Sequence, residues 1–370
     1  PGELRRLLAE PLPRSAQGID AAFNDFVEKV AAGSARVGHP RFLGWIRTSP
    51  LAAAIYAEAL AAALNQSVAV WEGAPAATEV ELRVIEWLKE LSGFAPESGG
   101  ILTSGGSAAN FIALLAARQA ALPDVRQTGL AGAPPLSVYL TGETHYCIPK
   151  AVEMMGLGQA SLRFIRTDDR FRMDADALRR QIQADRREGR RPMAVAATLG
   201  TVNSGACDDL LALGAVCREE HVWLHVDGAY GGIAHLVPGK EHLAAGLAEA
   251  DSFTFDPHKS LFIPFEAGLA LLRDPKILPA TFSMQTSYLP NSPEAAFSDG
   301  RGTDQDGLPL HFRDYGPQLS RGFRALKIYL TLKTYGADAL GAAQARLFGL
   351  AARLGERLQA EADFELLAPV

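Results

Sequence analysis

Several features that mark particular classes of protein are scarce or absent in this sequence. Only three of its 370 residues are cysteines, and none stands in a CxxC pair, so neither a disulfide framework nor a zinc site is indicated. No apolar run approaches the roughly 18 residues that cross a bilayer, and the first residues lack the apolar core of a signal peptide. Basic residues number 36 against 42 acidic ones, for a net charge of -6, which argues against nucleic-acid or anionic-membrane binding. We therefore expect a cytoplasmic protein without a metal, nucleic-acid or membrane partner.

The residues that are present favour a large α/β protein. Hydrophobic residues make up 48% of the chain and charged residues 21%, which is enough to bury a sizeable core. Apolar strand-like runs alternate with amphipathic helical segments, a pattern typical of a largely parallel sheet flanked by helices. Strands are predicted at 136–141, 161–167, 193–201, 222–228, 251–256 and 267–274, and helices at 78–94, 110–122 and 173–189.

Two helical segments carry more detailed expectations. In the helix predicted at 78–94, Thr78 is expected as the N-cap and Glu81 as its capping-box partner. The apolar segment 51–64 is interrupted by Glu58 and is too short to span a bilayer. We expect it to form a helix that is either buried or faces a second copy of the chain.

The segment "SFTFDPHKSLFIPF" (252–265) places Lys259 among apolar and aromatic residues. Lysine is among the residues least often fully buried. One interpretation is a lysine at a strand end whose amine reaches water. The other is an amine kept nucleophilic by desolvation. The segment alone leaves both open.

A glycine pair in "LTSGGSAANFIALL" (102–115) precedes a predicted helix. Glycines let a backbone approach a ligand closely, and the amides at a helix N-terminus attract phosphate. The segment lacks GxGxxG and GxxxxGK[ST], so neither dinucleotide nor triphosphate binding is indicated. A phosphate cradle and a plain turn both remain open.

Two further polar residues follow apolar strands. Asp227 ends the strand in "WLHVDGAYGG", and His145 follows a strand in "LTGETHYCIPKA". Ligands of open α/β sheets bind at the carboxyl ends of strands. Asp227 would then be a ligand contact or an N-cap, and His145 a ligand contact or a local hydrogen-bonding residue.

Together these residues match the needs of pyridoxal 5'-phosphate. The glycine turn would hold its phosphate, and Lys259 would form a Schiff base with it. The carboxylate of Asp227 would keep the pyridine nitrogen protonated, and the His145 ring would stack on the cofactor.

The motifs "TSGGSAAN", "THY", "ATLGT", "HVDGAYGG" and "DPHK" occur in this order. In this combination the chain closely resembles the group II pyridoxal-phosphate decarboxylases, which include aromatic-L-amino-acid, histidine and glutamate decarboxylases. The likeness runs from "HPRFLGW" (39–45) to "RGFRALKIYLTLKTYG" (321–336). It implies an enzyme, a carboxy-lyase that converts an L-amino acid into its amine and carbon dioxide.

The resemblance also implies an architecture, that of pyridoxal-phosphate fold type I, as in aspartate aminotransferase. Its large domain has a mostly parallel seven-stranded sheet flanked by helices. We expect a dimer-forming N-terminal helical segment at 1–50, the cofactor-binding domain at 51–327, and the start of a small, incomplete α+β C-terminal domain at 328–370.

Residue roles follow from the same resemblance. Lys259 corresponds to the Schiff-base lysine, Asp227 to the partner of the pyridine nitrogen, and His145 to the ring-stacking histidine. Tyr288, in "TSYLP" (286–290), corresponds to the tyrosine of a mobile loop that protonates the carbon after carbon dioxide leaves. The remaining implied cofactor contacts are Gly105, Gly106, Ser107, Thr198, Ala229 and His258.

The loop around Tyr288 bears on both assembly and reaction type. In the family it reaches the site of the neighbouring subunit, so a homodimer is implied. Relatives with phenylalanine at that position tend to be aldehyde synthases, so Tyr288 favours simple decarboxylation. An aldehyde synthase, a carbon–carbon lyase on the same scaffold and a non-catalytic homologue are the alternatives.

The chain departs from the family at several positions. Ser260 stands where many members have tryptophan, and Asp256 where the family often has asparagine; a carboxylate near a phosphate would repel it. "GWIRTSP" places Trp45, Arg47 and Thr48 in the segment that lines the substrate pocket. Arg47 would bind an acidic side chain or be an ordinary solvated arginine, so aromatic and acidic substrates both stay open.

Overall fold

The computed structural model describes residues 1–284 and 310–370, which form two compact units, Pro1–Ser49 and Pro50–Val370. The first unit contains helices α1 (Gly2–Leu7) and α2 (Ile19–Asp25) and a π-helical turn (Phe26–Ala31), and none of the residues in these three elements is buried. Tyr288 lies outside the described residues.

The second unit is built on a seven-stranded sheet with the order β1-β7-β6-β5-β4-β2-β3. The pairings β2–β3, β2–β4, β4–β5 and β5–β6 are parallel, whereas β7 runs antiparallel to both β1 and β6. The predicted, mostly parallel seven-stranded sheet is therefore confirmed. The strands are β1 (Gly99–Thr103), β2 (Leu136–Thr141), β3 (Leu162–Ile165), β4 (Arg191–Thr198), β5 (Trp223–Asp227), β6 (Ser252–Phe255) and β7 (Gly268–Leu272).

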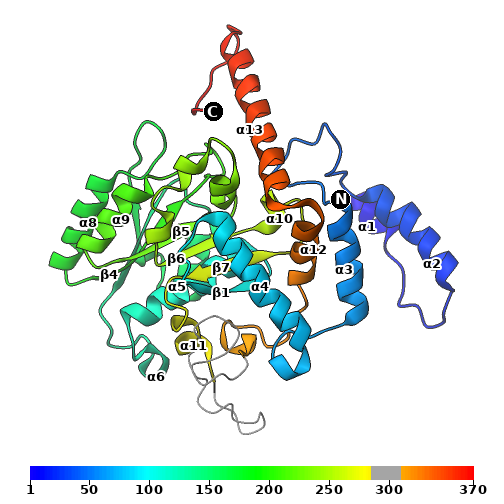
Figure 1. The fold of residues 1–370 in the computed structure, drawn as a ribbon, viewed down its shortest axis with the longest axis horizontal. Helices are drawn as coiled ribbons and strands as arrows, with labels where there is room; N and C mark the ends of the chain where they lie inside the picture. Colours follow the sequence, from blue (N-terminus) through cyan, green and yellow to red (C-terminus); the bar gives the residue numbers. More distant parts are fainter. Residues whose placement is uncertain (285–309) are drawn as a thin grey trace. The chain divides into compact units, whose positions relative to one another are not determined.

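Helices cover both faces of this sheet (Figure 1). Alternate residues of β4 belong to different core clusters: Val195 and Ala197 pack with residues of α8 and α9, and Ala194 and Ala196 with residues of α5 and α7. Successive side chains of a strand point to opposite faces, so each face has its own apolar layer. The main helices are α3 (Ala52–Leu64), α4 (Pro75–Ser92), α5 (Gly106–Ala121), α7 (Cys147–Met154), α8 (Ala175–Arg187), α9 (Leu210–Glu219), α12 (Ala325–Tyr335) and α13 (Ala337–Gln359), and the short ones are α6 (Val125–Thr128), α10 (Pro257–Ser260) and α11 (Ile277–Phe282).

The start of α4 differs from the prediction. The helix begins at Pro75, a favoured first helical residue because its missing N–H needs no partner there. Thr78 therefore lies within the first turn, where its Oγ1 donates to the carbonyl oxygen of Ala74. Glu81 forms a buried ion pair with Arg321 and accepts a hydrogen bond from the Leu102 amide. The predicted capping box is wrong, because a buried guanidinium takes the carboxylate.

Helix α3 is only partly covered within its unit. Ala54 and Ala57 are buried, and the helix packs against α12. Its large apolar side chains instead face outward, with Ile55, Tyr56 and Leu60 at least 50% exposed.

Within the described residues, no helix has both the length and the apolar composition needed to cross a bilayer. The separate domain expected from residue 328 stays a prediction.

Candidate active site

The carboxyl ends of the central strands gather the polar residues singled out in the sequence. Thr198 ends β4, Asp227 ends β5, and Asp256 follows β6. Thr198 and Asp227 are register partners in the parallel pairing. Because these strands end at the same edge of the sheet, residues that lie far apart in the chain meet beside the N-terminus of α5, a helix that packs against β4, β5, β6 and β7.

The carboxylate of Asp227 is fixed through both of its oxygens. Its side chain is buried; Oδ1 accepts from the Ala229 amide at 3.0 Å, and Oδ2 accepts from Asn110 Nδ2 at 3.0 Å. The following 3-10 helix begins at Gly231 with Tyr230 at its N-cap position. The N-cap interpretation of Asp227 is therefore wrong, and the carboxylate is oriented at the end of its strand.

Lys259 lies on the short helix α10 and is paired with a buried acid. Its side chain is 26% exposed, and its Nζ is 3.1 Å from Oδ2 of Asp256, whose side chain is 2% exposed. The amine thus does not simply extend into water. A partly buried lysine held in this way by a buried acid is positioned for chemistry at the site.

His145 shares this neighbourhood. Burial lowers the pKa of His145, and the positive charge of Lys259 lowers it further while the negative charge of Asp227 opposes the shift. Its Nδ1 accepts a hydrogen bond from the Cys147 amide at 3.3 Å. The imidazole is therefore neutral near pH 7 and lies within electrostatic reach of both Lys259 and Asp227.

The glycine turn forms a close-fitting cradle. Gly105 has φ of +118° and precedes α5, a conformation that side-chain-bearing residues rarely adopt. A Cβ on Gly106 would approach Asp256 Oδ2 to 2.8 Å and the Ala229 Cβ to 3.3 Å. Ser107, in the first turn of the helix, is exposed. Small residues and the start of a 16-residue helix thus suit a bound phosphate.

His258 borders the same cradle. Its Nδ1 lies 2.6 Å from the carbonyl oxygen of Ala267, and burial lowers its pKa to about 4. A Cβ on Gly105 would lie 3.5 Å from its Cε1. The ring is therefore neutral and brings no positive charge to the cradle.

The predicted residues fit pyridoxal phosphate in composition and placement. The glycine cradle suits the phosphate, the oriented carboxylate of Asp227 suits a protonated ring nitrogen, and the amine of Lys259 suits the aldehyde. One group disagrees with the rest: Asp256 puts a second carboxylate beside the cradle, and its buried Oδ1 has no hydrogen-bonding partner among residues 1–284 and 310–370.

The substrate residues expected from the sequence belong to the first unit. Trp45 is 78% exposed and adopts a positive φ of 57°. The guanidinium carbon of Arg47 lies 5.4 Å from the centre of the Trp45 ring. The substrate role of Trp45, Arg47 and Thr48 stays a prediction.

Sequence reasoning missed the polar residues behind the site. Asn110 and His225 are fully buried, and Asp208 is nearly so. Asp208 accepts hydrogen bonds from the Thr198 and Met173 amides. One signal was present: polar residues at 225 and 227 alternate with apolar ones, as do those at 252 and 254 on the neighbouring strand. Such a stripe on two buried strands requires polar partners from elsewhere.

Asp256 makes the stability of the protein depend on pH. Burial raises its pKa to about 7, and Lys259 only partly opposes this shift. Between pH 4 and pH 7 the folded chain keeps a proton that the unfolded chain has released, so this group's contribution falls as pH rises. We expect Asp256→Asn to lose less stability than the wild type from pH 4 to pH 8, by on the order of 2–4 kcal/mol.

Urea unfolding of the cofactor-free protein at several pH values measures this difference. Asp169→Asn, at an exposed aspartate, is the control and should follow the wild type. Parallel curves for the wild type and Asp256→Asn would contradict the prediction.

Comparison with known proteins identifies the family. The pyridoxal-dependent decarboxylase conserved domain matches residues 1–370. An aromatic-L-amino-acid decarboxylase from Bacillus atrophaeus is 34% identical over 366 residues, covering 99% of this chain and 73% of the relative. A phenylacetaldehyde synthase from Petunia hybrida is 31% identical over 377 residues, covering 100% of this chain and 72% of the relative.

A solved structure agrees with these matches. The crystal structure of Oryza sativa TDC with PLP and tryptamine has a TM-score of 0.90 at 30% identity, covering 100% of this chain and 75% of that chain. The chain belongs to the pyridoxal-dependent decarboxylase family: it is a carboxy-lyase that uses pyridoxal 5'-phosphate to convert an L-amino acid into its amine and carbon dioxide.

Proposed function

We propose that this decarboxylase acts on an aromatic L-amino acid and that Lys259, Asp227 and His145 are its catalytic residues. The observation that supports the residue assignment best is their common neighbourhood. The charges of Asp227 and Lys259 both influence the pKa of the His145 ring. All three residues lie near the carboxyl ends of the central strands, where α/β enzymes bind their ligands.

The bound cofactor supplies an electron-accepting ring that takes up the electron pair left when the carboxylate departs as carbon dioxide. Asp227, already held by Asn110 and Ala229, would keep a proton on the ring nitrogen. Lys259 would bind the cofactor through its amine and yield that place to the amine of the substrate. His145, neutral near pH 7, would assist Tyr288 in returning a proton to the substrate carbon.

The other predicted contacts would hold the cofactor. Gly105, Gly106 and Ser107 provide amides at the start of α5 for the phosphate, beside His258. Thr198 and Ala229, near the ends of β4 and β5, would flank the ring. We propose that Trp45, Arg47 and Thr48 bind the substrate.

The names of the relatives favour an aromatic substrate, among them the Bacillus atrophaeus enzyme. Arg47 favours the second candidate, an acidic substrate, because a guanidinium pairs well with a carboxylate.

We also propose a cytoplasmic location. Its support is the three free cysteines, Cys147, Cys207 and Cys217, which suit a reducing compartment; cell fractionation tests it, and recovery in an oxidising compartment would refute it.

Carbon dioxide release from a panel of amino acids tests the proposed function. Phenylalanine, tyrosine and tryptophan are compared with glutamate, aspartate and cysteine sulfinate, and we expect kcat/KM at least about tenfold higher for an aromatic member. Lys259→Ala should lower kcat by on the order of 10³-fold and abolish the visible absorbance of lysine-bound cofactor. The exposed Lys276→Ala is the matched control. Full turnover by Lys259→Ala would refute its assignment, and preference for an acidic member would refute the substrate class.

Tyr288 decides between amine and aldehyde in our proposal. Its support is the match of "TSYLP" to the catalytic loop of the family. We expect Tyr288→Phe to keep cofactor affinity and to divert turnover toward aldehyde, with consumption of dioxygen and release of ammonia and peroxide along with carbon dioxide. Peroxide and amine assays on the same samples measure this partition. Unchanged amine output would contradict the role of Tyr288, and stoichiometric peroxide from the wild type would favour the aldehyde-synthase alternative.

We further propose that the enzyme is a homodimer formed partly through α3. Tyr56, Leu60 and Leu64 are spaced four residues apart, share one side of the helix and are more than half exposed. Such an apolar stripe is typical of a protein interface. Analytical ultracentrifugation should give twice the mass of the chain, and Leu60→Asp should shift the protein toward monomer. Leu211→Asp, at an exposed leucine on α9, should not. A monomeric wild type would refute the proposal.

A further inference from the structure

A line of polar side chains, buried except for the half-buried Trp223, runs beneath α5 from the start of β5 to its end. Trp223, His225 and Asp227 alternate along β5 and share one face. On the neighbouring strand, Ser252 is the register partner of His225, and Thr254 that of Asp227. The side chain of Asn110, on α5, contacts this line from the helix above it.

Successive side chains in this line are joined by hydrogen bonds. Trp223 Nε1 lies 2.8 Å from Ser252 Oγ, which lies 2.9 Å from His225 Nδ1. The Nε2 of His225 lies 2.8 Å from Asn110 Oδ1, and Asn110 Nδ2 lies 3.0 Å from Asp227 Oδ2. The chain of five side chains is continuous, and we call it the Trp223–Asp227 relay.

The inner end of the relay determines the direction of its bonds. An ionised carboxylate only accepts, so Asn110 turns its amide nitrogen toward Asp227 and its Oδ1 toward His225. His225 therefore donates from Nε2 to Asn110 Oδ1, which leaves Nδ1 of the neutral ring to accept from Ser252. At the outer end the indole N–H of Trp223 donates to Ser252.

Two further contacts hold Asn110 in this orientation. Thr254 Oγ1 donates to Asn110 Oδ1 at 2.7 Å, and Asn110 Nδ2 lies 3.2 Å from Cys147 Sγ. His225 is fully buried, and burial lowers its pKa to about 4, so the neutral form that the relay requires is the one present near pH 7. The amide of Asn110 has no freedom to reverse its oxygen and nitrogen.

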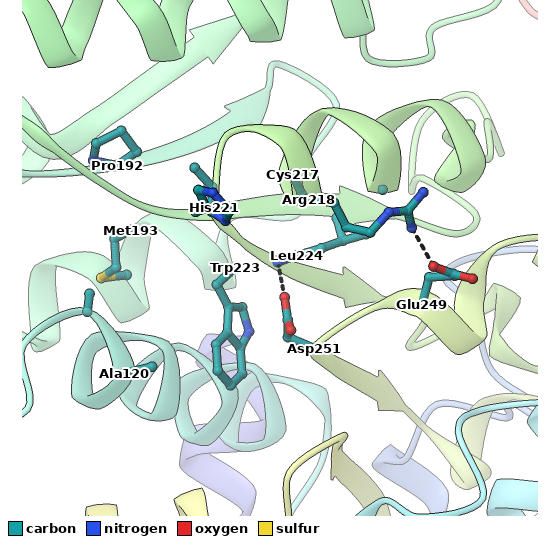
Figure 2. A pocket seen from close by; sticks show the side chains of 13 residues that line it. Ala120, Pro192, Met193, Cys217, Arg218, His221, Trp223, Leu224, Glu249 and Asp251 are labelled. Carbon is teal, nitrogen blue, oxygen red and sulfur yellow. Dashed lines mark hydrogen bonds and ion pairs between the residues drawn. The ribbon is translucent and has the colours of Figure 1, made fainter.

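The outer end of the relay borders a pocket. Trp223 lines a cavity of about 390 Å³ together with Met193, Cys217, His221 and Asp251. Figure 2 shows the indole of Trp223 at this pocket, with Asp251 beside it accepting a hydrogen bond from the Leu224 amide. Trp223, at the outer end, can therefore be substituted without removing a contact of Asp227, and such a variant serves as a control.

We propose that Asn110 is a positioning residue that, held by His225 and Thr254, orients the Asp227 carboxylate toward the ring nitrogen of the cofactor. This proposal rests on the assignment of Asp227 made above. Asn110 acts through Asp227 and takes no part in bond making. Its removal frees one carboxylate oxygen to rotate, so interaction with the ring nitrogen weakens while interaction with the phosphate does not.

A cofactor analogue separates this role from a general structural one. Dissociation constants are measured for pyridoxal 5'-phosphate and for its 1-deaza analogue, in which the ring nitrogen is replaced by C–H. For Asn110→Ala we expect about a tenfold loss of affinity for pyridoxal 5'-phosphate, the size of one hydrogen bond to a charged group, and less than a twofold change for the analogue. Trp223→Phe, at the outer end, should change neither constant more than twofold.

The outcomes are distinct. Equal losses for both cofactors, or no loss for either, would overturn the proposal. Asp227→Ala serves as the reference. If the ratio of its dissociation constants for pyridoxal 5'-phosphate and the 1-deaza analogue equals that of the wild type, the assignment of Asp227 itself fails. Urea unfolding of each cofactor-free variant checks folding, and Asn110→Ser, which keeps a small polar side chain, replaces Asn110→Ala should that variant not fold. Asn110→Ser should show the same selective loss.

Discussion

The hydrogen bond between Asn110 and Asp227 joins the two halves of the site. Asn110 belongs to the helix whose N-terminus suits a phosphate, and Asp227 to the strand whose end we propose to hold the pyridine nitrogen. An ionised carboxylate buried without partners is very costly. The amide of Asn110 and the backbone amide of Ala229 make this burial tolerable, and they also fix the direction in which the carboxylate points. If Asp227 has the role that we propose, stability and function depend on the same contact.

The two faces of the sheet have different tasks. On β5, Leu224 and Val226 join the apolar core, whereas His225 and Asp227 face α5 with their hydrogen-bonding partners. Because strand side chains alternate, one strand can serve both tasks at once. Packing of the apolar face fixes the position of the strands. The polar side chains on the other face are therefore held at hydrogen-bonding distances more firmly than they would be on a loop.

A buried carboxylate lies beside the glycine turn that we propose to bind phosphate. Asp256 pairs with Lys259 at 3.1 Å, beside the glycine turn. A bound phosphate would bring further negative charge to a place that already holds a buried carboxylate, and like charges disfavour ionisation. A protonated Asp256 removes this conflict and offers a donor in its place. In this way the chain would accommodate an acid beside the proposed phosphate site.

Sequence alone determined the features that depend on local pattern. Apolar runs predicted six of the seven strands, because strands buried in a sheet are rich in apolar residues; β1, which begins with two glycines, escaped this signal. Motif order was enough to identify the family and its cofactor. Tertiary structure decided the rest. Glu81, predicted to cap its own helix, instead pairs with Arg321, which is 240 residues away in the chain. Asn110 meets Asp227 across 117 residues. Only packing reveals such pairs, since a buried polar group takes whichever partner the fold brings within hydrogen-bonding distance.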